Sequence, residues 1–245
     1  MALNERQNEI LRILKEKKKV NVNELSKLFY VSEATIRRDL VEMNGMGLVE
    51  RSHGGALLPE NSEEISIFFR MEKNAQEKER AATKALPYIP PFKSVFIDSS
   101  STALALAERM DFSHKTVVTN NLQTAIQLSK KPNVTLVMLG GMVQYNTISA
   151  TGSWTARQLE DFKFDLMISS CAAVIDGYAY ERSLDQKEIK LAAFERAEKH
   201  ILLIDSTKFG AHGAYRLMSL EAYDFVATDG APPENLKDKD IKFIY

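Results

Sequence analysis

The chain has 245 residues, of which 44% are hydrophobic, 27% charged and 9% aromatic. This composition is typical of a globular protein of one or two domains, and it excludes disordered, collagen-like and fibrous classes. The charges nearly balance, with 32 Lys and Arg against 33 Asp and Glu, but residues 1–57 hold 10 basic and 8 acidic residues, a net charge of +2.

Sites built from cysteine or histidine are not expected. The single cysteine, Cys171, excludes an intramolecular disulfide and a cysteine metal cluster, and the four histidines are scattered along the chain. We therefore expect no metal, no cofactor and a cytoplasmic protein. The N-terminus has no apolar signal core, and the apolar stretch over 134–143 is interrupted by Gly140 and Gly141. It is far shorter than the roughly 20 residues that span a bilayer, so no membrane partner is expected.

Three helices are predicted at the start of the chain. Apolar residues at helical spacing predict helices over 4–17 and 22–29. Ser32 is a residue type that caps helix N-termini, so a third helix is expected to begin there and to end at Gly45 and Gly47. Three helices with a short connection between the second and the third are the layout of a helix-turn-helix.

The third predicted helix has two different faces. At 100° per residue, Ile36, Leu40 and Met43 form a narrow core stripe. The residues at or toward the opposite face are Ala34, Arg37, Arg38 and Val41. A small residue with two arginines suits the DNA major groove, where Arg pairs with guanine or with phosphate. In the polar first turn, Ser32 and Thr35 are placed to touch base edges or a phosphate.

A hairpin is predicted after the third helix. Residues 48–58 resemble two short strands around Gly54 and Gly55, which are a turn signal. Such a wing would bring Arg51 and His53, near its tip, to the sugar-phosphate of an adjacent groove. The alternative is a solvated pair of arginines on the third helix beside a plain turn. The combination of turn, cap and wing favours DNA binding.

The chain is expected to divide into two domains. A polar, acidic stretch begins at Pro59, so we expect a winged helix-turn-helix domain over 1–58 and a linker over 59–74. The domain over 75–245 is expected to sense an effector and to oligomerise. It begins with a predicted helix over 75–86, which prolines end.

The second domain alternates short apolar strands with helical patterns. The predicted strands are Val95–Ile97, Thr116–Thr119, Val134–Leu139, Leu166–Ile168, Ile201–Ile204 and Phe225–Ala227. Strands of this kind predict an α/β fold with a mostly parallel sheet covered on both faces. Such sheets bind ligands beyond the carboxyl ends of their strands.

Polar residues follow several of these strands. They are Asp98, Ser99, Ser100, Ser101, Thr102, Thr119, Asn120, Asn121, Gly140, Gly141 and the run from Asp205 to Gly210. A hydroxyl-rich loop at a helix N-terminus supplies N–H donors and a favourable dipole for an anion, and Lys208 would add the countercharge. Each loop alone is more simply a helix cap. Their convergence on one sheet edge favours a binding site.

A further helix is predicted over 184–199. Ser183 and Gln186 have the spacing of a capping box at its start. Glu188 and Lys190 follow in its second turn, but residues two apart point roughly 200° from each other. We therefore expect only one of the two to face a pocket and the other to lie on the surface.

The sequence resembles a known family in both halves. Residues 22–40 and 51–56 closely resemble the winged helix-turn-helix of the DeoR family of bacterial transcriptional regulators. The second half is similar to the family's effector domain at 98–102, 118–120, 139–141, 188–190 and 205–210. The chain departs from the family pattern at Ser100, a glycine in the family, and at Ser170 and Cys171, which replace Gly-Ala.

The resemblance implies a fold and a function. The effector domain would be similar in fold to ribose-5-phosphate isomerases. The chain would be a regulator, usually a repressor of sugar-catabolic genes, whose affinity for a double-stranded DNA operator changes when a phosphorylated sugar binds. Operator contact is implied for Ser32, Thr35, Arg37 and Arg38. Effector contact is implied for the matched loops, including Glu188, Lys190 and Lys208. We expect a homodimer or a homotetramer.

Two other functions remain open. In one alternative, the chain is a DNA-binding protein whose second domain serves only for oligomerisation. Alternatively, the chain is a sugar-phosphate isomerase or deaminase whose acids and bases come from Asp98, Asp176, Glu188, Asp205 and Lys208. A fused winged helix has no purpose in a bare enzyme, so catalysis is the least favoured interpretation and no catalytic residue is assigned.

Overall fold

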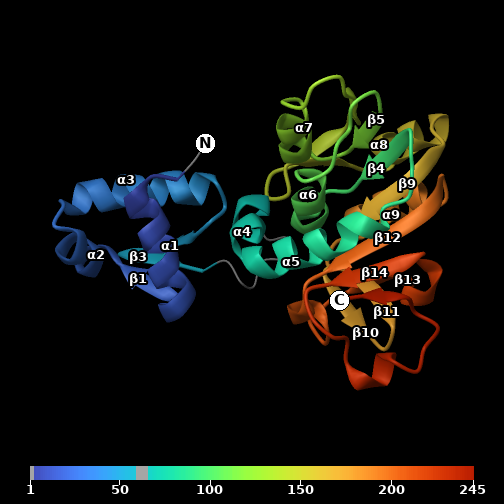
Figure 1. Ribbon diagram of the computed structural model, residues 1–245. Coiled ribbons are helices and arrows are strands. Elements are labelled where there is room, and N and C mark those ends of the chain that lie inside the picture. The colour runs from blue at the N-terminus through green and yellow to red at the C-terminus, as the bar shows by residue number, and fades with distance from the viewer. Residues whose placement is uncertain (1–2, 59–65) are drawn as a thin grey trace. The chain divides into compact units, whose positions relative to one another are not determined.

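The computed structural model describes residues 3–58 and 66–245 (Figure 1). The chain forms two compact units, Met1–Arg70 and Met71–Tyr245, called here the N-terminal and C-terminal units. The expected linker over 59–74 lies partly outside the described residues. Its second half contains a short helix, α4 (Ile67–Glu72).

The N-terminal unit contains the three predicted helices. Its elements are α1 (Glu5–Lys17), β1 (Lys19–Asn21), α2 (Val22–Phe29), α3 (Glu33–Gly45), β2 (Glu50–Ser52) and β3 (Gly55–Leu57). Each long helix begins where a polar side chain accepts a hydrogen bond from a free backbone N–H: Asn4 caps α1, Asn21 caps α2 and Ser32 caps α3. The prediction of a Ser32 cap is confirmed, because its Oγ accepts from the Thr35 N–H at 3.2 Å.

The predicted wing is confirmed, and it belongs to a three-stranded sheet. Strand β3 lies in the centre and pairs antiparallel with both β1 and β2. Strand β1 was not predicted, because only Val20 of its three residues is buried. A Cβ on Gly55 would lie 1.9 Å from the Val20 carbonyl oxygen, so glycine is required for β3 to approach β1.

The hydrophobic core of the N-terminal unit joins all three helices to the sheet. Leu14 of α1, Leu25 of α2 and Ile36 of α3 are almost completely buried in it. Phe69 of α4 packs into the same core, and the Ser66 hydroxyl donates to the Met46 carbonyl at 2.6 Å. The chain therefore remains attached to this unit up to the beginning of α4.

The C-terminal unit is built on a parallel sheet, as predicted. Its strands are β4 (Ser94–Ile97), β5 (Thr116–Thr119), β6 (Thr135–Met138), β9 (Phe164–Ser169), β12 (Ala197–Ile204), β14 (Phe225–Thr228) and β15 (Phe243–Ile244). They lie in the order β15-β14-β12-β9-β4-β5-β6, and every pair is parallel. All six predicted strands are confirmed; β15 was not predicted.

Helices cover both faces of this sheet. They are α5 (Ala75–Ala85), α6 (Ser101–Ala107), α7 (Leu122–Leu128), α8 (Ser153–Gln158) and α9 (Leu184–Phe194), with 3-10 turns η1 (Leu86–Tyr88), η2 (Leu159–Asp161), η3 (Ser206–Lys208), η4 (Leu220–Ala222) and η5 (Glu234–Leu236). Val95 and Ile97 of β4 pack with α5 and α6, whereas Phe96 between them packs with Ile189 of α9. Successive residues of β4 thus face opposite sides of the sheet, and Val95, Phe96 and Ile97 are all buried, as expected for a strand covered on both faces.

Two small antiparallel sheets complete the unit and were not predicted. One consists of β10 (Ala173–Ile175), β11 (Tyr178–Glu181) and β13 (Tyr215–Ser219), and the other of β7 (Met142–Gln144) and β8 (Ser149–Thr151). Strands β10 and β11 are joined by Asp176 and Gly177, whose φ angles of 53° and 85° suit a tight hairpin.

Two details of the predicted helix over 184–199 are wrong. Helix α9 ends at Phe194, because the chain from Ala197 onward pairs with β9 as part of β12. The capping box at Ser183 does not form, since its side chain makes no cap hydrogen bond. The Gln186 side chain instead bonds to hydroxyl groups at the sheet edge.

Replacing Gly55 with alanine tests the close approach of β3 to β1. We expect Gly55→Ala to destabilise the N-terminal unit by about 1–3 kcal/mol, because the added methyl overlaps backbone that cannot yield locally. Calorimetric unfolding of the full chain measures the effect. Gly45→Ala is the control, since a Cβ at that helical position meets nothing within 4 Å. Equal stability of the two variants would contradict this account.

Candidate functional site

The exposed face of α3 is the candidate DNA-binding surface. Ile36, Leu40 and Met43 are buried, as their spacing predicts. The side chains on the opposite side are exposed: Ala34, Arg37, Arg38 and Val41. The helix therefore presents a cationic face to solvent while its other face packs in the core.

A buried carboxylate fixes how α3 is held. Asp39 is 4% exposed and accepts two hydrogen bonds from Arg6 of α1, at 2.6 Å and 3.2 Å. Gln7, also on α1, bridges Asp39 and Glu42. Because Asp39 faces α1, its neighbour Arg38 faces outward. This pairing between residues 33 apart in the chain was not predicted.

The two arginines of α3 differ in their hydrogen-bond partners. Arg37 donates to the Glu33 carboxylate at 2.7 Å, and this hydrogen bond lowers the pKa of Glu33 below its usual value. Within residues 3–58 and 66–245, the Arg38 guanidinium has no hydrogen-bond or ion-pair partner. Arg38 is thus the cation of this face that is available to a ligand.

The remaining predicted DNA contacts lie at the helix start and on the wing. Ser32 and Thr35 bond to each other through their hydroxyls at 3.0 Å. Arg51 on β2 and His53 in the following turn are both exposed. The Arg51 N–H donates to the Asn44 side chain at the end of α3, which fixes where the wing begins.

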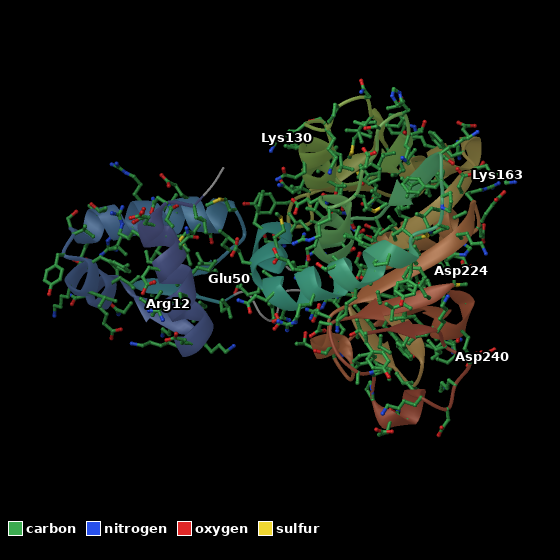
Figure 2. All side chains as sticks on the ribbon, in the orientation of Figure 1. Arg12, Glu50, Lys130, Lys163, Asp224 and Asp240 are labelled. Atoms are coloured by element: carbon green, nitrogen blue, oxygen red, sulfur yellow. The ribbon has the colours of Figure 1, made fainter. Side chains whose placement is uncertain are left out.

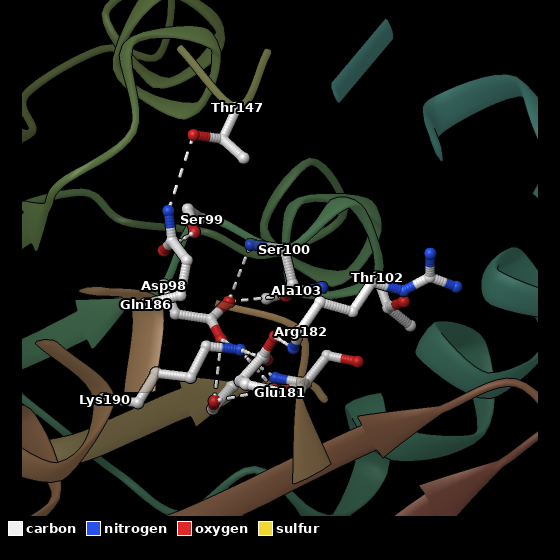
Figure 3. Close-up of polar contacts among 12 residues, drawn as sticks. Asp98, Ser99, Ser100, Thr102, Ala103, Thr147, Glu181, Arg182, Gln186 and Lys190 are labelled. Atoms are coloured by element: carbon white, nitrogen blue, oxygen red, sulfur yellow. Dashed lines mark hydrogen bonds and ion pairs between the residues drawn. The ribbon is translucent and has the colours of Figure 1, made fainter. Parts of the chain in front are cut away.

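In the C-terminal unit, Asp98 is the centre of a buried polar cluster at the carboxyl edge of the sheet (Figure 3). One carboxylate oxygen accepts from the Ser100 N–H at 2.9 Å and from the Ser100 hydroxyl. The other accepts from the Ser169 hydroxyl at 2.7 Å and the Ser170 N–H at 3.1 Å. Strands β4 and β9 are neighbours in the sheet, so their ends meet at this carboxylate.

Lys190 of α9 supplies the opposite charge. Its Nζ lies 2.9 Å from the Asp98 carboxylate, donates to the Ser170 carbonyl at 2.6 Å and pairs with Glu181 of β11. These three partners use all three N–H donors of the ammonium group. Glu188 is exposed. The prediction that only one of Glu188 and Lys190 faces inward is therefore confirmed.

The charges of the buried pair depend on each other. Burial disfavours the ionised form of Asp98, but the Lys190 ammonium and the surrounding hydroxyls overcome it and lower the pKa of Asp98 below its usual value. Burial likewise opposes the charge of Lys190, and the carboxylates of Asp98 and Glu181 raise its pKa above the usual value. Each group is held in its charged form by the others.

Lys208 is a second cation at the same edge. Its Nζ donates to the Ser170 hydroxyl at 2.6 Å and to the Thr102 hydroxyl at 3.1 Å. The nearest carboxylate oxygen, on Asp205, is 3.6 Å away, which is beyond hydrogen-bond distance. Among the described residues, Lys208 thus donates hydrogen bonds to two neutral hydroxyls, and its charge is balanced by the ion pair with the buried Asp205.

The loop over 98–102 forms without glycine. Ser100 has φ −86° and ψ 142°, an extended conformation that any residue adopts. Its hydroxyl accepts from the Ala103 N–H at 3.2 Å and so caps α6. Nearby, burial raises the pKa of the Cys171 thiol to about 11, so this group is neutral at pH 7.

Gln186 joins the loop to the β7–β8 hairpin. It accepts from the Ser99 hydroxyl at 2.7 Å and donates to the Ser149 hydroxyl at 2.8 Å and to Thr147 at 3.4 Å. Figure 3 shows Gln186 between Ser99 and Thr147. Gln186 lies one turn before Lys190 on α9, so one helix face holds both parts of the network.

The other predicted effector residues are bound to neighbouring segments. Asn120 is buried and donates to the Ala150 carbonyl at 3.0 Å, while its own Oδ1 has no partner among the described residues. The Thr119 hydroxyl accepts from the N–H two residues ahead. Gly140 and Gly141 lie against α8, where the Thr155 hydroxyl donates to the Gly140 carbonyl at 2.9 Å. Ser101 is buried.

Several residues of the cluster were not predicted. They are Thr147, Ser149, Ser169, Ser170, Glu181 and Gln186. Ser169 and Ser170 follow a predicted strand, so the same rule that selected Asp98 could have found them. The others come from elements that were missed or misassigned.

Comparison with known proteins identifies the family. Residues 6–62 match a family model described as a DeoR-like helix-turn-helix domain, and residues 73–230 match the DeoR C terminal sensor domain. The chain belongs to the DeoR family of transcriptional regulators. It is thus a DNA-binding regulator with a sensor domain.

Several DeoR-family relatives align over almost the full length of both chains. The regulator GolR of Listeria innocua is 34% identical over 92% of this chain and 90% of its own. The glycerol-3-phosphate regulon repressor of Escherichia coli is 32% identical over 95% and 93%. The L-fucose operon activator of Haemophilus influenzae is 30% identical over 96% and 95%.

Solved structures give only a distant similarity to this DeoR-family chain. Ribose 5-phosphate isomerase A from Methanocaldococcus jannaschii has a TM-score of 0.39 and 11% identity, over 56% of this chain and 55% of that chain. The eIF2B delta subunit of Chaetomium thermophilum has a TM-score of 0.46 and 12% identity, over 67% and 60%. Similarity at this level says nothing about activity.

Two kinds of feature, groups of metal ligands and membrane-spanning helices, are absent from the described part of the chain. Residues 3–58 and 66–245 hold no group of three or more His, Cys, Asp or Glu side chains placed to bind a metal ion. The same residues include no helix that is long and apolar enough to cross a membrane.

Removing the ammonium of Lys190 tests the buried charge pair. We expect Lys190→Met to destabilise the C-terminal unit at pH 7 by about 3–5 kcal/mol, because Asp98 is left buried without a cation. In the native chain the pKa of Asp98 is lowered, so its stabilising contribution is complete above its ordinary pKa and is lost as the pH falls through the lowered one.

In the variant the sign reverses. Burial without Lys190 raises the pKa of Asp98 above its unfolded value, so stability is lost as the pH rises through that value. The difference between variant and native chain should therefore grow from pH 4 to pH 8 in denaturant unfolding. Lys187→Met, on the same helix, is the control. A difference independent of pH would contradict the ion-pair account.

Proposed function

We propose that this DeoR-family regulator represses sugar-catabolic genes and that a phosphorylated sugar controls its affinity for operator DNA. The observation that carries the proposal concerns the partners of two cations, one in each unit. Arg38 on α3 has no partner within the described residues, and Lys208 at the sheet edge donates its hydrogen bonds to two neutral hydroxyls, beside an ion pair with Asp205 at 3.6 Å. One suits a guanine or a phosphate of DNA, and the other a phosphate of a small ligand.

For DNA binding, α3 enters the major groove and the wing contacts the backbone beside it. Ser32 and Thr35 lie at the start of α3, where the backbone N–H groups favour a phosphate. The exposed Arg51 and His53 of the wing add contacts in an adjacent groove. Arg37 is oriented by Glu33, so it contributes positive charge from a fixed position.

For effector binding, the phosphate replaces the hydroxyl groups that Lys208 now contacts. Thr102 and Ser170 hold the ammonium at 3.1 Å and 2.6 Å. Phosphate oxygens in their place would form charge-assisted hydrogen bonds, which are stronger than those to neutral hydroxyls. Lys190 has its donors occupied by Asp98, Ser170 and Glu181, so its role is to position the loop and not to bind the ligand.

The names of the relatives support a phosphorylated sugar or polyol as the effector. One is the repressor of a glycerol-3-phosphate regulon, and another regulates an L-fucose operon as an activator. A homodimer or homotetramer would set the distance between two α3 helices on paired half-sites. The effector would then favour assemblies in which that distance no longer matches the operator.

Arg38→Ala tests the DNA-binding surface. We expect binding to DNA selected from a random duplex library to weaken by about 1–3 kcal/mol with relaxed preference at one base pair if Arg38 reads a base. If Arg38 contacts a phosphate, its replacement weakens binding equally for all DNA sequences. The slope of log affinity against log salt concentration then becomes shallower by about one.

Arg12→Ala is the matched control for this test. Arg12 is exposed on α1, where it pairs with Glu9 and Glu16 (Figure 2). Gel-shift titration of the full chain at two salt concentrations measures both variants. An unchanged affinity of Arg38→Ala would exclude Arg38 from the interface.

Lys208→Ala tests the effector site. A sugar phosphate at about 100 times its Kd should stabilise the native chain by about 2.7 kcal/mol, because it binds only the folded state. We expect a thermal-shift screen with ribose 5-phosphate, fructose 1-phosphate and glycerol 3-phosphate to find such a ligand, and Lys208→Ala to lose its shift. The unphosphorylated sugars should give no shift.

Lys163→Ala is the control for the effector test. Lys163 lies before β9, at the opposite edge of the sheet, and is paired with Glu198 (Figure 2). An equal shift in native chain and Lys208→Ala would place the anion elsewhere. The absence of a shift with every phosphorylated sugar would favour a second domain that serves only for oligomerisation.

A further inference from the structure

The exposed face of α3 has an apolar centre. Ala34 and Val41 are seven residues apart, so on a helix of 3.6 residues per turn they lie within about 20° of each other. Arg37 and Arg38 lie about 50° to either side of the line through Ala34 and Val41. The side chain of Val41 is 50% exposed. The two arginines therefore flank an apolar line and do not form the middle of the face.

This apolar line is not part of the core. The residues that pack α3 into the N-terminal unit are Ile36, Leu40 and Met43, whose relative exposures are 0%, 2% and 0%. They lie on the side of the helix opposite Val41. A β-branched residue on an exposed helix surface is also a poor helix former, so neither packing nor helix propensity explains valine at position 41.

The inference rests on the proposed function, in which α3 lies in the major groove. In that arrangement, the position of the apolar line on the helix determines which part of the groove it faces. The middle of a helix face points to the floor of the groove, where the base edges lie, and its flanks point to the phosphate walls. The single apolar group that base edges present there is the methyl of thymine. Arginines on the flanks suit the phosphates and reach the outer base edges.

We propose that Val41 reads the methyl group of a thymine and that Ala34 lets the helix approach the base edges closely. Val41 then determines one position of each operator half-site as an A·T pair with thymine facing the helix. Arg38, one turn before Val41 on an adjacent line, contacts a neighbouring base pair or the phosphate beside it. Sequence preference at the Val41 position is thus apolar and independent of salt.

Deoxyuridine substitution tests this contact, because it removes only the methyl group. Duplexes are first selected from a random double-stranded library by the full-length chain, and each thymine of the selected half-site is then replaced by deoxyuridine in turn. We expect one such replacement to weaken binding of the native chain about fourfold, as the loss of one buried methyl implies. The variant Val41→Ala should bind the thymine duplex about fourfold more weakly and lose nothing further with deoxyuridine.

Leu28→Ala is the matched control, since Leu28 is also an exposed aliphatic residue, 57% exposed, on α2. It should respond to deoxyuridine as the native chain does. If every deoxyuridine substitution costs Val41→Ala as much as the native chain, or if the selected half-sites contain no thymine, the inference is overturned while DNA binding stands. If the chain selects no sequence at all, the proposed function fails, and the inference fails with it.

Discussion

The ion pair between Asp98 and Lys190 is the interaction on which the C-terminal unit depends. Asp98 directly follows β4, Lys190 belongs to α9, and β9 and β11 supply further partners in Ser169 and Glu181. A buried charge is tolerated only with partners of good geometry, so this pair fixes the position of α9 over the end of the sheet. Because Gln186 is on the same face of α9, the loop over 98–102 and the β7–β8 hairpin are held by the same helix.

The N-terminal unit also contains a buried carboxylate paired with a cation, but this cation is more exposed than Lys190. Asp39 is buried and paired with Arg6, whose side chain is 30% exposed. Adjacent residues of a helix point about 100° apart, so fixing Asp39 against α1 turns Arg38 toward solvent. In the C-terminal unit, Lys208 is linked to Asp98 only through Ser170, whose N–H donates to Asp98 and whose hydroxyl accepts from Lys208. The two cations proposed to bind ligands, Arg38 and Lys208, are therefore not the cations that pair with these buried carboxylates.

The sequence predicted the features that depend on nearby residues. The three helices of the N-terminal unit, the Ser32 cap, the wing and six parallel strands each follow from a pattern within about a dozen residues. Strands β1, β13 and β15 are two to five residues long and pair with strands well separated along the chain, so no local pattern reveals them. The pairing of Asp98 with Lys190 has the same origin. The hairpins β7–β8 and β10–β11 are local, but their strands of three or four residues are too short to show a clear alternation of apolar and polar residues. The opposite error occurred at Gln186. Its spacing from Ser183 is typical of a capping box, but its side chain bonds to the hydroxyls of Ser99 and Ser149.

The difference between Lys190 and Lys208 determines what an anion can change. Lys190 has all its donors occupied by charged or backbone groups, so a ligand that displaced them would break the fold. Lys208 donates to two neutral hydroxyls and pairs with Asp205, and the proposed phosphate would replace the hydroxyls with charge-assisted hydrogen bonds. Thr102 lies in the first turn of α6, and Ser170 follows β9 and donates its N–H to Asp98, so the proposed exchange would alter the surroundings of the Asp98 cluster. A ligand shifts an equilibrium only by its differential affinity for two states, and the proposed exchange at Lys208 would supply such a difference.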